Sequence, residues 1–254
     1  MLNNKSYING EWVKGLGKNF ANINPSDTKD IISEYNECDS NQFNQAVEAA
    51  KKAQIEWASV GIEKKSNILI NIGNELISKS KEIGELLSRE EGKTLPEGIG
   101  EVARAGQQFQ YYGAECLRMA GEKIPSTRPG YQVEITREPV GIIGIISPWN
   151  FPIAIPAWKA APALMCGNAV ILKPASLTPA SAIALTEIIA KQDLPAGLFN
   201  LIIGSGSGIG NQIATSPEIP AITFTGSVEV GKSLYADASP LLKKCKWRWD
   251  LKIL

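Results

Sequence analysis

The segment Ile145–Ser176, IISPWNFPIAIPAWKAAPALMCGNAVILKPAS, restricts the possible folds most strongly. It continues Gly141–Ile146, a β-branched run without alternation, which is typical of a strand buried on both faces of a parallel sheet. Pro148 has no N–H to donate and ends this strand. A helix is expected near Pro152–Cys166 and a second buried strand at Ala169–Leu172. This order predicts a right-handed βαβ unit with its ligand edge at the carboxyl ends of the strands.

The chain after residue 176 continues this alternation. Strands are expected at Leu198–Ile203 and Ala221–Phe224, with helices near Pro179–Lys191 and Gly208–Thr215. We therefore predict an α/β fold with a doubly wound parallel sheet.

The N-terminal half has helical periodicity from about residue 39 to residue 121. Asp39 or Ser40 is expected to cap the first helix. The segment Ser88–Val102, SREEGKTLPEGIGEV, is charged and interrupted by glycine, which favours a solvated helix end and loop over a direct functional role. Further helices are expected at Lys64–Ser78, Lys81–Glu91 and Glu97–Met119.

Two segments indicate β-structure outside the strand–helix alternation. Tyr7–Trp12 contains Asn9–Gly10, a pair that suits a type I′ hairpin turn. Lys123–Pro139 alternates and carries three prolines, which favours edge strands or an arm outside the main sheet.

Composition excludes several classes of function. Lys and Arg number 26 and so do Asp and Glu, so no nucleic-acid or anionic-membrane partner is indicated. No apolar run is long enough to span a bilayer, and the N-terminus lacks the apolar core of a signal peptide. The four cysteines form no CxxC pair and there is no histidine, so we expect no metal site, no disulfide framework and a cytoplasmic location.

Several polar residues follow the predicted strands. Asn150 can donate to an oxyanion or can simply cap the following helix. Lys173 and Ser176 can meet a ribose or can be solvated. Phe224–Ser227 opens a helix whose N–H groups suit a pyrophosphate, although Ser227 can be an ordinary cap. Gly204–Gly210 is not GxGxxG, because Ile209 occupies the position of the third glycine, and it predicts a flexible turn.

Three motifs give the chain a recognisable pattern: PWNFP at 148–152, KPAS at 173–176 and FTGS at 224–227. In this order and at this spacing, the stretch Tyr7–Lys244 resembles the aldehyde dehydrogenase superfamily. The resemblance implies that Asn150 is the catalytic oxyanion donor and that Val230 lies under adenine or ribose. It implies a Rossmann-like cofactor site formed by Ile146, Ser147, Pro148, Trp149, Asn150, Lys173, Ala175, Ser176, Gly206, Gly210, Phe224, Thr225, Gly226, Ser227 and Val230. Cys166, inside an apolar helix, is expected to be a core thiol rather than a nucleophile.

Ser176 bears on the choice of cofactor. Many members of the family carry Glu there, which accepts the ribose hydroxyls and repels a 2′-phosphate. Serine lacks that charge and can donate to phosphate, and Lys173 adds a cation. We therefore expect NADP to be preferred, with NAD as the alternative.

The resemblance also implies domains and a reaction. Residues 1–20 and 123–140 are expected to form a β arm for homo-oligomerisation, and 21–122 with 141–244 the dinucleotide-binding domain. The stretches SREEGKTLPEGIGEVARAGQQF, REPVG and PWNFPIAIPAWK most resemble 2,5-dioxovalerate (α-ketoglutarate semialdehyde) dehydrogenases. The implied reaction is NAD(P)-dependent oxidation of a small aldehyde to a carboxylic acid.

Residues 245–254, CKWRWDLKIL, depart from the family. Members continue with a segment like QLEMGGKNP, whose glutamate is the general base, and reach the nucleophilic cysteine later. Reverse translation of 245–254, begun one base earlier, can read Met-Gln-Met-Glu-Met-Gly-Ser-Lys-Asn-Pro. We therefore expect a one-base loss in the codons of Lys243–Lys244, an out-of-frame tail and an absent catalytic domain. The alternative function is a non-catalytic fragment that at most binds a dinucleotide, and an ordinary divergent terminus is the alternative origin of the tail.

Overall fold

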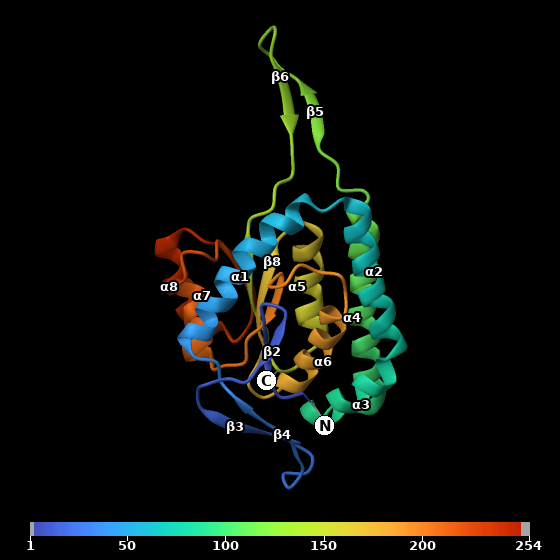
Figure 1. The fold of residues 1–254 in the computed structure, drawn as a ribbon, viewed down its shortest axis with the longest axis vertical. Coiled ribbons are helices and arrows are strands. Elements are labelled where there is room, and N and C mark those ends of the chain that lie inside the picture. Colours follow the sequence, from blue (N-terminus) through green and yellow to red (C-terminus); the bar gives the residue numbers. More distant parts are fainter. Residues whose placement is uncertain (1–2, 250–254) are drawn as a thin grey trace.

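The computed structural model describes residues 3–249. Its main sheet has seven strands in the order β11-β10-β7-β8-β9-β1-β2 (Figure 1). The first five of these pair in parallel, which confirms the predicted α/β fold with a mostly parallel sheet. They are β11 (Lys244–Trp249), β10 (Ala221–Gly226), β7 (Ile142–Ile146), β8 (Ala169–Lys173) and β9 (Phe199–Leu201).

The order in which the chain adds strands to the sheet reverses between β7 and β10. It runs from β7 to β8 to β9 in one direction and then returns to place β10 on the other side of β7. The connecting helices are α5 (Ala154–Met165), α6 (Pro179–Ala190), the π-helical turn η1 (Gly206–Gly210) and α7 (Asn211–Thr215). Open α/β sheets bind ligands outside the carboxyl ends of the strands at such a reversal.

Helices cover both faces of the sheet (Figure 1). One face carries α1 (Ser40–Ser59), α7 and α8 (Val228–Ala238), with the short turn η2 (Ser239–Leu241) after α8. The other face carries α5 and α6, against which an outer layer packs: α2 (Ile62–Ser78), α3 (Ser80–Glu91) and α4 (Leu95–Cys116). Asp39 caps α1 in a capping box with Gln42, as the sequence predicts for that residue.

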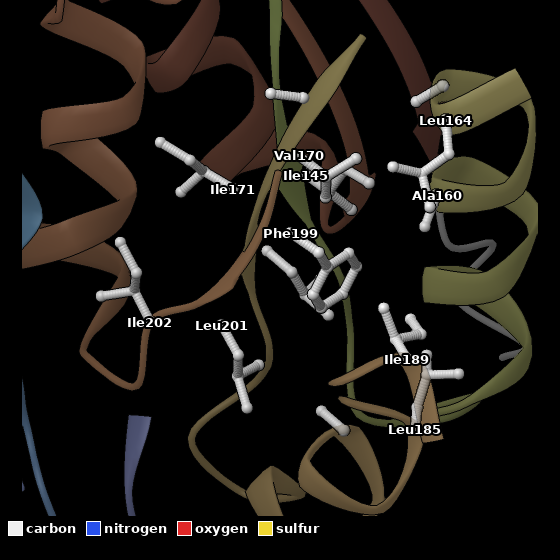
Figure 2. Close-up of a cluster of buried hydrophobic side chains, with 14 of the residues drawn as sticks. Ile145, Ala160, Leu164, Val170, Ile171, Leu185, Ile189, Phe199, Leu201 and Ile202 are labelled. Atoms are coloured by element: carbon white, nitrogen blue, oxygen red, sulfur yellow. The ribbon is translucent and has the colours of Figure 1, made fainter. Parts of the chain in front are cut away.

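The core lies on both sides of β8, all five of whose residues are buried. Figure 2 shows Val170 and Phe199 directed toward the helices that carry Leu164 and Ile189, whereas Ile171 points to the opposite face. The uninterrupted apolar run of this strand is therefore a consequence of burial on two faces.

The N-terminal hairpin belongs to the main sheet. Strands β1 (Ser6–Ile8) and β2 (Glu11–Val13) are joined by Asn9 and Gly10, whose φ angles of 52° and 82° are those of the expected I′ turn. Strand β1 pairs antiparallel with β9 through Tyr7 and Leu201. Grouping residues 1–20 with the arm was therefore wrong, since hydrogen bonds place the hairpin at the far edge of the sheet.

Two further antiparallel pairs lie outside the main sheet. Strands β3 (Asn19–Ile23) and β4 (Ile31–Asn36) form one. The second is β5 (Glu122–Pro125) with β6 (Gln132–Ile135), a hairpin that projects far from the body of the molecule (Figure 1). All eight residues of β5 and β6 are exposed. In residues 3–249, helices long and apolar enough to cross a membrane are absent.

Candidate functional site

The predicted site residues meet at the carboxyl edge of three neighbouring strands. In the sheet register, Ile146 at the end of β7 pairs with Phe224 of β10 on one side and with Lys173 of β8 on the other. The Ser147 amide donates to the Lys173 carbonyl at 3.2 Å. The segments after all three strands therefore open onto one edge, at the reversal between β7 and β10.

Lys173 is held in place by carbonyl groups. Its Nζ donates to the carbonyls of Pro174 at 2.7 Å and Gly204 at 3.1 Å, and the Ser176 hydroxyl lies 3.5 Å from the latter. Burial lowers the pKa of Lys173 to about 8, although the negative charge of Glu37 acts to raise it. Lys173 and Ser176 are thus brought together, as a shared ribose site requires.

The glycine turn after β9 leaves room beside Lys173. A Cβ on Gly206 would meet nothing within 4 Å, and one on Gly210 would lie 3.7 Å from the Lys173 side chain. Gly206 is exposed, so the space beside it is open to a ligand, whereas Gly210 is buried against the Lys173 side chain.

Two of the helices that follow the parallel strands have their N-termini occupied by buried carboxylates. Glu101 accepts from the amides of Ile153 and Ala154 at the start of α5, both at 3.0 Å. Glu90 accepts from Ala180 and Ser181 at the start of α6, at 2.7 and 2.8 Å. An anion cannot use these ends, because a carboxyl group of the protein already accepts from their N–H groups.

The N-terminus of α8 is different. The Ser227 hydroxyl accepts from the Val230 amide at 3.3 Å, and no carboxylate from another element caps this end within residues 3–249. Val228 and Val230 are 44% and 48% exposed and provide an apolar surface beside it. Ser227 is thus the cap of α8, and the two exposed valines lie in the first turn of this helix.

Asn150 lies on the loop between β7 and α5. Its side chain makes no capping bond to α5, whose first amides bond Glu101 instead. The Asn150 Oδ1 is buried without a hydrogen-bond partner among the described residues. The helix-cap alternative for Asn150 therefore does not hold, and its side-chain amide is not committed to a structural hydrogen bond.

A hollow of about 590 Å³ adjoins Asn150. It is walled by aromatic side chains from the same loop and from α5, together with charged residues of α4, and such an apolar hollow with few polar groups is typical of small-molecule sites. The lining includes Trp149, Asn150, Phe151, Trp158, Glu97 and Arg104.

The remaining predicted cofactor residues differ in accessibility. Trp149 is 52% exposed, and Ala175 and Gly226 are partly exposed, so each can contact a ligand. Ser147, Pro148 and Thr225 are buried, with the hydroxyls of Ser147 and Thr225 lacking partners among the described residues. The Phe224 side chain, 3% exposed, packs on Trp247 and Trp249 of β11. The Phe224 side chain is therefore part of the packing beneath the strand edge rather than an accessible ligand contact.

The expectation of a solvated segment at Ser88–Val102 holds for its centre, Thr94–Glu97, which is exposed, but was wrong for three charged residues nearer its ends. Glu90 and Glu101 are 2% and 5% exposed, and the Lys93 side chain is 13% exposed. Sequence alone cannot identify them, because the helix ends that bind the carboxylates come from residues 153–154 and 180–181, far along the chain.

The four cysteine thiols are in surroundings that disfavour the thiolate. Burial raises the pKa of the thiol in all four, Cys38, Cys116, Cys166 and Cys245. Cys166 lines a larger hollow of about 860 Å³ near the base of the arm, which includes none of the predicted site residues. In the described part of the chain, no three His, Cys, Asp or Glu side chains are grouped as metal ligands.

The fold is an α/β domain with a mostly parallel, Rossmann-like sheet, and the predicted site residues meet at one edge of it. The family model described as "Aldehyde dehydrogenase family" matches residues 12–248, and the chain belongs to that family. The match extends four residues beyond Lys244, where the resemblance was expected to stop.

Similar proteins agree with this assignment. A 2,5-dioxopentanoate dehydrogenase of Saccharolobus solfataricus is 36% identical over 233 residues, which cover 91% of this chain and 49% of the relative. An alpha-ketoglutaric semialdehyde dehydrogenase of Bacillus subtilis is 40% identical, with 89% and 47% covered. The crystal structure of an E. coli NADP-dependent enzyme superposes with a TM-score of 0.95 at 31% identity, covering 98% of this chain and 52% of the other. The chain spans about half the length of these relatives.

Proposed function

We propose that this chain is the dinucleotide-binding portion of an enzyme that oxidises an aldehyde to a carboxylic acid with NADP or NAD. The observation that carries the proposal is the common edge of β7, β8 and β10, where Asn150, Lys173 and the N-terminus of α8 lie together. Similarity to 2,5-dioxopentanoate and α-ketoglutarate semialdehyde dehydrogenases supports a semialdehyde that carries a carboxylate as the substrate.

Each part of the edge has a chemical task in this proposal. A bound dinucleotide supplies the hydride acceptor. The Asn150 amide donates to the aldehyde oxygen as negative charge develops on it, which is worth several kcal/mol in a site that excludes water. Lys173 and Ser176 hold a ribose, and the amides of α8 hold the pyrophosphate. Relatives described as NADP-dependent and others solved with NAD+ support both cofactors.

We infer that aldehyde oxidation needs residues beyond those described. The reaction requires a nucleophile at the aldehyde carbon, and burial keeps each cysteine thiol of this chain protonated near neutral pH. The chain taken alone is then a dinucleotide-binding module without turnover. The exposed apolar pair Ile124 and Val133 of the arm supports a role in self-association.

We also infer that β11 is encoded out of frame. The reading begun one base earlier has glutamate where this chain has Arg248, and a guanidinium cannot accept a proton as the family's base glutamate does. Arg248 lies over the Trp158 ring at 5.4 Å, beside the edge that carries Thr225. Resequencing the DNA across the Lys243–Lys244 codons tests whether a base was lost in reading the gene. One additional adenine and an open frame onward would show that β11 is out of frame through a sequencing error. An unchanged sequence would rule out that error.

Calorimetric titration of the chain with NADP+ and NAD+ tests the dinucleotide site. Gly206→Val fills space that is open in the protein, so folding is retained while affinity falls at least about tenfold, equivalent to about 1.4 kcal/mol. Gly61→Val is the matched control, because a Cβ there also meets nothing and Gly61 precedes α2, outside the site. Equal affinities for the two variants would contradict the proposed site.

A further inference from the structure

The loop that carries Asn150 is fixed by a lysine from the α3–α4 junction. Lys93 Nζ donates to the backbone carbonyl of Asn150 at 3.1 Å and to Glu101 Oε2 at 2.6 Å. It also lies 2.9 Å from Glu91 Oε2. The Lys93 and Glu101 side chains are 13% and 1% exposed, so these bonds are shielded from water and from salt.

The same ion pair holds the other end of the loop. Glu101 Oε1 accepts from the amides of Ile153 and Ala154, both at 3.0 Å, while Oε2 bonds Lys93. A single Lys–Glu pair therefore fixes the loop at Asn150 and at its junction with α5, from more than fifty positions away in the sequence.

Lys93 also contacts the middle of the loop. Its Nζ lies 4.4 Å from the centroid of the Phe151 ring, within the range of a cation–π interaction. The Phe151 side chain is 43% exposed. The ammonium group thus contacts the residue after Asn150 as well as Asn150 itself.

We propose that Lys93 and Glu101 are positioning residues for the Asn150 amide and for the Ile146–Asn150 stretch that receives the nicotinamide half of the cofactor. This inference rests on the proposed function, because it assigns the stretch a ligand. It explains how the Asn150 side chain can stay uncommitted: the backbone of the loop is fixed by charges, so the side chain needs no structural hydrogen bond of its own.

The chemical benefit is orientation. A donor that acts on a developing oxyanion must be held before the reaction, because small displacements of a catalytic group are costly. Removing one member of a buried ion pair leaves the other charge without compensation, so the loop is expected to leave its present position when Lys93 is lost.

The first experiment compares two ligands on the same protein. Affinities for NADP+ and for 2′,5′-ADP, its adenosine half, are measured by calorimetry for the wild type and for Lys93→Met. We expect 2′,5′-ADP affinity within twofold of wild type and NADP+ affinity at least tenfold lower. Lys64→Met, which removes an exposed lysine paired with Asp193, is the control and should change neither.

A purely structural role gives a different result. If Lys93 only stabilises the fold, the two ligands lose affinity in equal proportion, and this would overturn the proposal. Lys93→Arg retains a cation that can donate to Glu101 and should restore most of the NADP+ affinity that Lys93→Met loses.

The second measurement needs no ligand and separates this inference from the proposed function. Amide hydrogen exchange of Ile153 and Ala154 should be at least tenfold faster in Glu101→Gln than in wild type, with the amides of β8 unchanged. If the wild type binds neither nucleotide, the proposed function fails and this exchange alone decides the positioning role. Unchanged exchange at Ile153 and Ala154 would refute it.

Discussion

Lys173 is proposed to hold a ribose, so its protonation state is expected to affect cofactor binding. Burial among the carbonyls of Pro174 and Gly204 brings its pKa down to about 8, so the ammonium deprotonates within an accessible range. The charged form keeps a third N–H for a ribose hydroxyl after its two carbonyl bonds.

Affinity for NAD+ should therefore decrease as pH rises through 8. Loss of a hydrogen bond from a charged donor is expected to cost roughly 1.5 kcal/mol, about tenfold in the dissociation constant. Titrations between pH 6.5 and 9.5 measure this, and NAD+ is used because it has no 2′-phosphate. Lys173→Met should bind weakly with a flat profile; a flat profile in the wild type would show that the Lys173 charge is irrelevant.

Ser176 is expected to govern the choice between NADP+ and NAD+. Its hydroxyl lies near the Gly204 carbonyl, adjoining Lys173. Ser176→Glu should shift the ratio of NADP+ to NAD+ affinities toward NAD+ by about tenfold, since a carboxylate repels the 2′-phosphate and accepts ribose hydroxyls. Ser176→Gln, of similar size but neutral, is the control. An unchanged ratio in Ser176→Glu would remove Ser176 from cofactor selection.

At the level of elements, buried carboxylates join α3 and α4 to the helices that follow the sheet. Glu90, at the end of α3, accepts from the first amides of α6, and desolvation raises its pKa to about 7. The folded value lies above the usual 4.5, so the folded chain binds this proton more tightly than the unfolded chain does.

Glu90 should therefore make stability depend on pH. Its contribution is fully present below pH 4.5 and is lost as pH rises through 7, by up to roughly 3 kcal/mol in the free energy of unfolding. Urea denaturation of wild type and Glu90→Gln at pH 4.5 to 8 measures the difference between their free energies of unfolding. This difference should change over that pH interval. A constant difference would mean that Glu90 stays ionised in the folded protein.

The elements themselves could mostly be predicted from sequence. β-branched runs and breaks such as Pro148 identify β7, β8 and β10 because burial on two faces requires an apolar strand. The roles of Glu90, Lys93 and Glu101 could not be predicted, because their charge favours solvent unless distant partners are known. The partner of the N-terminal hairpin was missed for the same reason, since β9 is nearly two hundred residues away from β1.

At the scale of the whole molecule, the arm stands out within residues 3–249 because all the residues of its two strands are exposed. The arm β5–β6 leaves the body as an exposed hairpin, and its base is closed by a bond from Arg137 to the Ala120 carbonyl at 3.1 Å (Figure 1). The exposed side chains of Ile124, Tyr131, Val133 and Ile135 lie along it.

Replacing residues 123–135 by a short Gly-Ser linker should leave the thermal midpoint within a few degrees, because no arm strand is buried. Self-association should be lost, so sedimentation equilibrium should change from an oligomer to a monomer. The double variant Ile124→Ser/Val133→Ser is a milder test on the intact arm. A monomeric wild type, or an unchanged mass in both variants, would contradict the assigned role of the arm.

A crystal structure of the chain with NADP+ would show whether a dinucleotide binds at the reversal between β7 and β10. We expect the pyrophosphate at the N-terminus of α8 beside Ser227, a ribose within hydrogen-bond distance of Lys173 and Ser176, and the nicotinamide against Ile146–Asn150. A dinucleotide bound at the hollow near Cys166, or at the N-terminus of α5 or α6, would contradict it.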